Sequence, residues 1–224
     1  MNNIINIEKI LTFFNYVFWF LTLNLLFLVV NTPLVLFLIF IGISKIGTYL
    51  PLFLLCAIPF AVSFTSLLYC MSKLIKNYEI EPFKDFIKAF KSNFKNATTI
   101  WILELIAIFI LYTNIKFFSQ IKGSILFTGL FTGLLFVILL ITPHIFMLTS
   151  KFSMNILSTI KSASILTITR PIITISNILC LLVTLVLFEI NPATTVLFIG
   201  SIASFLIAFA NKTLIKELEE KANA

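Results

Sequence analysis

The sequence predicts an all-α protein, a polytopic membrane helix bundle with six transmembrane helices. Six apolar runs separated by short polar gaps fill the chain, at about 13–43, 48–71, 98–118, 123–149, 171–189 and 193–211. A helix needs about 20 apolar residues to cross the hydrocarbon layer, and the alternating pattern of a barrel strand is absent. Hydrophobic residues make up 60% of the 224 residues, against about 45–50% in soluble domains. A soluble core is therefore excluded, and residues 1–224 are expected to form a single integral membrane domain.

The first run, 13–43, is longer than one straight span requires and contains Asn31-Thr32-Pro33 in its middle. Proline removes a helical hydrogen bond, so a kink or break is expected there. One kinked and tilted helix absorbs the extra length at modest cost. The alternative is two half-spans around a re-entrant turn, and an odd number of spans would then move the N-terminus to the outer side.

An amphipathic helix is predicted at about 82–97, between the second and third runs. It begins at Glu81-Pro82, because proline at the first helical position loses no hydrogen bond. One helical face is apolar and a neighbouring stripe is basic, which is typical of a helix lying in the membrane interface. The apolar face comprises Phe83, Phe86, Ile87, Phe90, Phe94 and Ala97, and the stripe of candidate lipid or partner contacts comprises Lys84, Lys88, Lys91 and Lys95.

A second amphipathic helix is predicted at about 152–169, and Arg170-Pro171 then opens the fifth run. The simplest interpretation of both amphipathic helices is that they are cytoplasmic elbows which return the chain to the bilayer. The alternative is that they dock a cytoplasmic partner, in the way that the coupling helices of ABC importer permeases dock an ATPase. The Glu-Ala-Ala segment of those permeases is absent from this chain.

Basic residues divide unequally between the two sides of the predicted membrane. Thirteen fall on one side and three on the other, and the positive-inside rule turns this difference into an orientation. Both termini are therefore expected in the cytoplasm. The larger set comprises Lys9, Lys73, Lys76, Lys84, Lys88, Lys91, Lys95, Lys151, Lys161, Arg170, Lys212, Lys216 and Lys221, and the smaller set comprises Lys45, Lys116 and Lys122.

Three polar residues inside the runs form a candidate polar pocket: Asn24, Glu104 and His144. At ~1.5 Å per residue, Glu104 and His144 both lie roughly 10 Å from the cytoplasmic ends of their runs, so contact between them is expected to be possible. An ionised carboxylate in hydrocarbon is costly, so Glu104 is expected to face the bundle and to stay neutral or find a donor. The alternative is a structural role, in which Glu104 is neutral and satisfied by hydroxyls such as those of Thr98, Thr99 or Thr142.

Features that point to catalysis are sparse. The chain has one histidine and only two acids in or beside the later runs, Glu104 and Glu189, too few for the usual catalytic constellations. We expect no enzyme activity, cofactor or metal, and interpret Cys56, Cys70 and Cys180 as small buried hydrophobes. The net charge of +7 indicates anionic lipid headgroups as partners and no nucleic acid, because the basic residues flank the runs.

The block Phe83–Ala97, preceded by Tyr69–Leu74, is similar to the most recognisable segment of the YesL family of bacterial membrane proteins, a group defined by a domain of unknown function. Phe13–Pro33 resembles the opening of that family, and Ser158–Ala163 with Arg170-Pro171 its second cytoplasmic segment.

This resemblance implies a six-span protein of the bacterial cytoplasmic membrane, encoded beside carbohydrate ABC transporters and without catalytic residues that can be carried over. We expect an accessory component of carbohydrate uptake, with a carbohydrate ABC transporter as its implied partner. The alternative is an independent small-molecule transporter or channel, which would need polar side chains to converge at depth.

Overall fold

The structure, a computed structural model, describes residues 2–223, without the side chains of residues 2–10, 193, 222 and 223. The side chain of Lys9 and residues 1 and 224 of the predicted domain therefore lie outside the described part. Within it the fold is all-helical and contains no strand. The helices are α1 (Asn2–Val30), α2 (Thr32–Phe40), α3 (Leu50–Cys56), α4 (Phe60–Asn77), α5 (Pro82–Ser119), α6 (Ile125–Lys151), α7 (Ile156–Thr169), α8 (Pro171–Ile190), α9 (Pro192–Val196), α10 (Ile199–Ala210) and α11 (Lys212–Asn223).

Several helices have the length and apolar composition of membrane spans. Among the described residues, four qualify alone: α5, α6, α8 and the Leu11–Val30 part of α1. The number rises to six if each of two bent pairs counts as one span, α3 with α4 (bent by 41°) and α10 with α11 (bent by 57°). The chain is thus compatible with a multi-pass membrane protein, while the six-span count itself stays a prediction.

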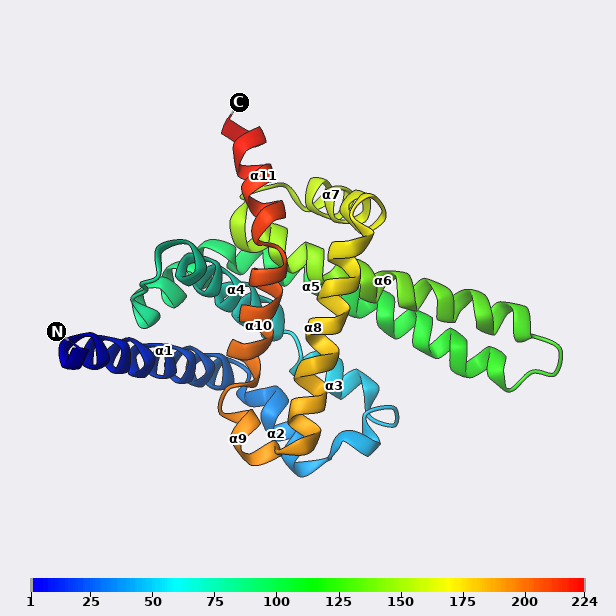
Figure 1. Cartoon of the computed structure of the whole chain (residues 1–224). Helices are drawn as coiled ribbons and strands as arrows, with labels where there is room; N and C mark the ends of the chain where they lie inside the picture. The colour runs from blue at the N-terminus through cyan, green and yellow to red at the C-terminus, as the bar shows by residue number, and fades with distance from the viewer. Residues whose placement is uncertain (1, 224) are drawn as a thin grey trace.

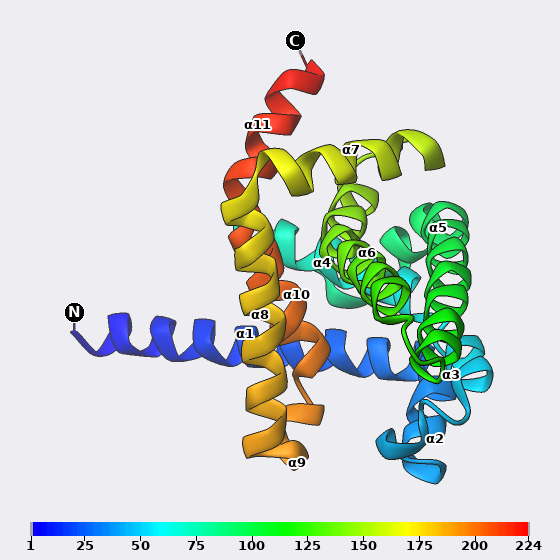
Figure 2. The ribbon, with the colours of Figure 1, turned by 90° about the vertical axis from the view of Figure 1, so that its right-hand side faces the viewer.

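The predicted break in the first run lies at Asn31, between α1 and α2. Pro33 stands in the first turn of α2, where its missing donor costs nothing, and α2 turns away from the line of α1 (Figures 1 and 2). The Asn31 side chain donates to the carbonyl oxygen of Phe27 at 2.8 Å and to Ser63 Oγ at 2.6 Å. The break is therefore fixed to α4 by a buried amide.

Helix α5 differs from the expected elbow followed by a span, because 82–97 and the third run form one continuous helix of 38 residues. No glycine or proline follows Pro82 before Ser119, so nothing in the sequence interrupts the helix. The predicted apolar face is also divided. Phe86 and Ala97 are buried, whereas Phe83, Ile87 and Phe94 are exposed.

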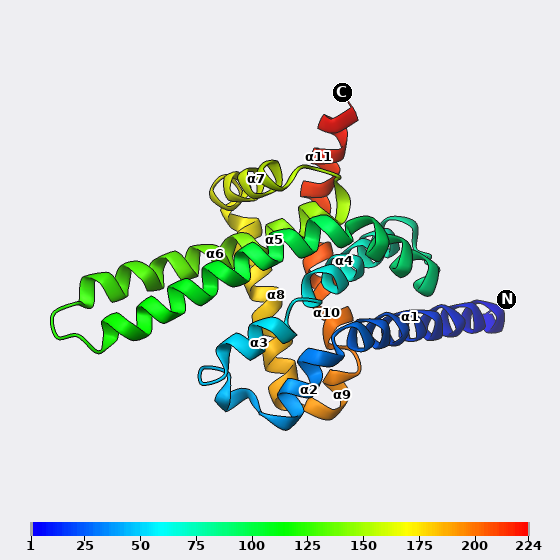
Figure 3. The same cartoon turned by 180° about the vertical axis from the view of Figure 1, so that it is seen from behind.

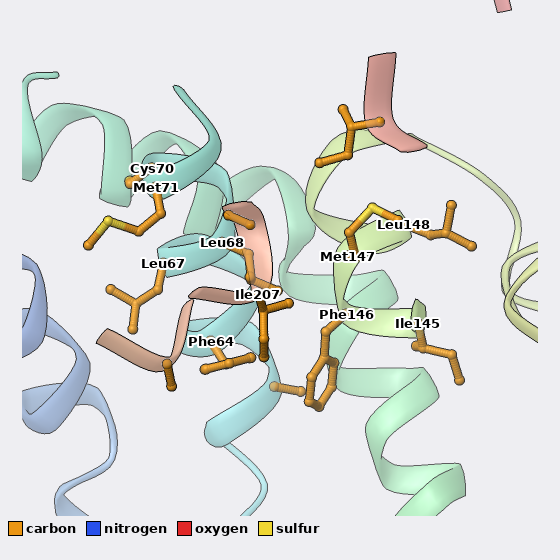
Figure 4. Close-up of a cluster of buried hydrophobic side chains, with 14 of the residues drawn as sticks. Phe64, Leu67, Leu68, Cys70, Met71, Ile145, Phe146, Met147, Leu148 and Ile207 are labelled. Atoms are coloured by element: carbon orange, nitrogen blue, oxygen red, sulfur yellow. The ribbon is translucent and has the colours of Figure 1, made fainter. Parts of the chain in front are cut away.

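Helix α4 lies at the centre of the hydrophobic core. Twelve of its 18 residues are buried, and it packs against α6 and α10 (Figure 4). The side chains labelled there are Phe64, Leu67, Leu68, Cys70 and Met71 from α4, Ile145, Phe146, Met147 and Leu148 from α6, and Ile207 from α10. At about 25 cal/mol per Å² of apolar surface removed from water or exchanged for close packing, such side chains account for much of the stability of the fold.

The remaining helices extend from this core in different directions. Helices α8 and α10 lie side by side, α7 lies across the ends of α6 and α8, and α1 and the α5–α6 hairpin run across the direction of α8 (Figures 1, 2 and 3). Helices that cross this steeply do not all follow one membrane normal. The arrangement therefore departs from the nearly parallel bundle expected of six spans.

Candidate functional site

Asn24 is fully buried on α1 and bridges the break between α9 and α10. Its Nδ2 donates to the carbonyl oxygen of Val196 at 2.9 Å, and its Oδ1 accepts the N–H of Gly200 at 2.9 Å. These are backbone groups at a helix end and a helix start, which have no partner within their own helices. The absence of a side chain at Gly200 lets α1 approach α10 this closely, since a Cβ there would lie 2.8 Å from Phe27 Cδ1. Asn24 thus acts as a structural bridge.

Glu104 is buried on α5 and faces α6. The hydroxyl of Thr142 lies 3.3 Å from Glu104 Oε1 and 2.9 Å from the carbonyl oxygen of Ile138. One hydroxyl has one proton, so its bond to the carboxyl group is the weaker of the two. Glu104 Oε2 is buried without a hydrogen-bond partner. The structure therefore places Glu104 beside one of the hydroxyls expected in the structural alternative.

His144 is fully buried on α6 and faces α8. Its Nε2 lies 2.9 Å from Thr174 Oγ1, and its Nδ1 has no hydrogen-bond partner. Thr142, the partner of Glu104, is only two residues away, and residues two apart on a helix point in different directions. Glu104, His144 and Asn24 therefore bind three different neighbours, and no hydrogen bond joins any two of them.

A second buried polar contact lies one turn beyond Thr174 on α8. Asn177 is almost fully buried there, and its Oδ1 accepts from Asn211 Nδ2 at 2.6 Å. The opposite atoms of this pair, Asn177 Nδ2 and Asn211 Oδ1, are buried without partners. The two asparagines are 34 positions apart, so no local pattern in the sequence links them. The position of Asn177 inside the apolar run 171–189 could have indicated a polar contact between helices, because a buried amide needs a partner.

The lysine stripe on α5 is exposed along its whole length, at Lys84, Lys88, Lys91 and Lys95. Within it, Lys84 pairs with Glu81 at 2.9 Å. The buried Asp85 beside the stripe binds Lys73 of α4 through both carboxylate oxygens at 2.7 Å. This ion pair fixes the start of α5 to α4 and leaves the remaining lysines free to face outward.

A basic cavity of about 450 Å³ lies where α4, α6, α10 and α11 meet. Its lysines come from three gaps that are far apart in the sequence, so no local pattern identified them as one site. Two glutamates of α11 also face it. The lining residues are Ser72, Ile75, Lys76, Tyr78, Lys151, Ala208, Lys212, Ile215, Lys216, Glu219 and Glu220.

A second cavity of about 280 Å³ lies between α3 and α5 and is lined only by apolar residues. Its lining residues are Pro51, Leu54, Leu55, Ile58, Ile102, Leu105, Ile106 and Phe109. Neither cavity includes Asn24, Glu104 or His144 in its wall. Among the described residues, no group of three His, Cys, Asp or Glu side chains is placed to hold a metal ion.

Residues 15–115 match the family model described as "Protein of unknown function, DUF624". This segment includes both blocks that carry the resemblance to the YesL family, Tyr69–Leu74 and Phe83–Ala97, and the YesL family is itself of the DUF624 type. No curated protein and no solved structure matches the chain.

Proposed function

We propose that this chain is a multi-pass protein of the bacterial cytoplasmic membrane that acts as an accessory component of carbohydrate uptake, beside an ABC-type transporter. One observation carries the proposal. Asn24, Glu104 and His144 are engaged in contacts between helices, whereas the basic side chains of α5, α7 and α11 are exposed. Exposed positive charge on one set of segments provides a contact surface for a partner or for anionic headgroups.

The internal polar residues favour this role over independent transport. A transport site needs polar groups that converge on one substrate path. Asn24 binds the α9–α10 break, Glu104 contacts Thr142, and His144 contacts Thr174. These contacts stabilise helix packing at three separate places.

In the proposed orientation both termini lie in the cytoplasm. Single cysteines at Lys45, Lys122 or Asn191, in a cysteine-free background, are expected to react with an impermeant thiol reagent added outside intact cells. Cysteines at Lys88 or Lys216 are expected to react only after the cells are opened. Labelling of intact cells at Lys88 would contradict the orientation. All five positions are exposed, so accessibility within the protein does not limit the result.

The accessory role is tested by photo-crosslinking in native membranes. A benzophenone side chain at Lys91, on the exposed stripe, is expected to form an adduct that mass spectrometry identifies as a subunit of a carbohydrate ABC transporter. The matched control is the same side chain at Lys122, which is also exposed but lies at the tip of the α5–α6 hairpin. The proposal fails if Lys91 gives no adduct with a transporter subunit, or if liposomes containing only this chain move a sugar.

A further inference from the structure

The basic cavity contains more positive than negative charge. Four lysines and two glutamates line it, and each glutamate already has a lysine partner. Lys76 pairs with Glu219 at 3.0 Å, and Lys216 lies 3.9 Å from Glu220. Among the described residues, Lys151 and Lys212 have no carboxylate within ion-pair distance. Two ammonium groups in the wall therefore form no ion pair.

Lys151 is the more informative of these two lysines. It ends α6, is partly buried, and lies over the ring of Tyr69 with Nζ 5.6 Å from the ring centroid. A cation–π contact contributes less than a paired anion, and a partly buried charge is costly without compensation. An anion in the cavity would supply that compensation for Lys151, and the exposed Lys212 of α11 adds a second positive charge to the same wall.

The walls of the cavity are held in place by contacts that do not involve these two lysines. The Lys76–Glu219 pair joins α4 to α11, and Arg170 at the start of α8 binds Glu217 of α11 at 2.5 Å. Leu214 of α11 is buried in the main core. Leu214 thus holds the first turns of α11 against the bundle, whereas the two ion pairs, whose side chains are largely exposed, add little. An ordered wall of this kind lowers the entropic cost of binding.

We propose that this cavity binds a phosphomonoester, with the phosphate group held by the ammonium groups of Lys151 and Lys212. The net charge of +2 on the lining side chains matches the charge of about −1.5 to −2 that a phosphomonoester carries at neutral pH. A volume of about 450 Å³ lies in the usual range of ~300–1,000 Å³ for small-molecule sites, which leaves room for an organic group. Ile75, Ala208 and Ile215 provide an apolar wall for that group.

The phosphate can be that of a soluble metabolite or that of a lipid headgroup, and two sets of probes separate these sources. The purified full-length chain in a neutral detergent is titrated with inorganic phosphate and glycerol 3-phosphate by calorimetry. The same protein in phosphatidylcholine nanodiscs is titrated with dihexanoyl phosphatidic acid. Binding of a soluble probe assigns a soluble ligand, and binding of the lipid alone assigns a headgroup. Both outcomes support the site.

Variants then locate the binding. Lys151→Gln and Lys212→Gln are each expected to weaken binding about tenfold, the effect of losing one charge-assisted hydrogen bond, and Lys151→Arg is expected to retain binding. The matched control is Lys45→Gln with Lys122→Gln, which removes two exposed charges far from the cavity and is expected to change affinity less than twofold. Lys212 is exposed, so its replacement does not disturb the core. The proposal is overturned if no probe binds, or if the control weakens binding as much as the cavity variants do.

Discussion

Replacement of Gly200 by alanine is expected to destabilise the protein although alanine is the better helix former. Gly200 lies in the first turn of α10, and an added Cβ would lie 2.8 Å from Phe27 Cδ1 and 3.1 Å from both Phe27 Cε1 and Asn24 Oδ1. Phe27 has little room to move, because its ring packs against those of Phe60 and Phe64 at centroid distances of 5.8 and 6.5 Å. The neighbours must therefore shift together.

The expected change in the free energy of unfolding combines two destabilising effects and one stabilising effect. Overpacking costs about 1–3 kcal/mol, and displacing Asn24 Oδ1 from the Gly200 N–H weakens one buried hydrogen bond by about 1 kcal/mol. Alanine stabilises a helix by about 1 kcal/mol relative to glycine, because it loses less backbone entropy on folding. The net destabilisation of Gly200→Ala is thus about 1–3 kcal/mol.

The free energy of unfolding is measured by titrating the protein with SDS in mixed micelles, with far-ultraviolet circular dichroism as the signal. The controls are Gly129→Ala and Gly133→Ala in α6, where an added Cβ meets no atom within 4 Å, so stability is expected to stay equal or rise slightly. If Gly200→Ala is as stable as these controls, the α1–α10 contact is not the close packing described above.

Three further predictions concern two contacts between helices and the exposed lysine stripe. Trp101→Phe removes the hydrogen bond from Nε1–H to the Ala57 carbonyl oxygen, 2.8 Å long, at the α3–α4 break, and is expected to lower the free energy of unfolding by about 1 kcal/mol; an unchanged SDS midpoint would contradict it. Glu104 and His144 contact different partners, so the effects of Glu104→Gln and His144→Gln on the free energy of unfolding are expected to add within about 0.5 kcal/mol. A larger coupling energy would show that the two residues touch. Replacing Lys88 and Lys91 by glutamine is expected to lower retention of phosphatidylglycerol in native mass spectrometry, at ~1 kcal/mol per charge, whereas equal retention would exclude these lysines from headgroup binding.

The positions of most helices could be predicted from the sequence. Hydrophobic run lengths located α6 and α8, and Pro33 and Arg170-Pro171 marked a helix break and a helix start. These signals are local, because proline geometry and apolar composition act within a few residues. The predicted boundary near Ala97, between the amphipathic helix and the third run, was wrong, because it was inferred from local composition alone. A change from amphipathic to fully apolar composition changes what a helix contacts, and it does not interrupt the backbone hydrogen bonds of α5.

The contacts between distant residues could not be predicted. Equal depth made a contact between Glu104 and His144 possible, but their partners depend on the rotation of α5 and α6 about their own axes, which the sequence pattern left open. The basic cavity required the start of α11 to lie near the C-terminal end of α4, and the Lys76–Glu219 pair joins residues 143 positions apart. Lysines in three separate gaps carried no sign that they share one cavity.

The continuity of α5 also makes it a stiff rod. Its 38 residues extend about 57 Å at 1.5 Å per residue, and the Lys73–Asp85 pair anchors one end to α4. A rotation of about 10° around that anchor would carry the opposite end through about 9 Å at the same rise per residue. Spin labels at Lys88 and Lys116 should report a single narrow distance near 42 Å from this geometry, whereas a broad distribution would reveal a joint. With such stiffness, a force applied at the lysine-bearing end reaches the apolar hairpin as a lever movement, with little of the motion lost to bending along the way.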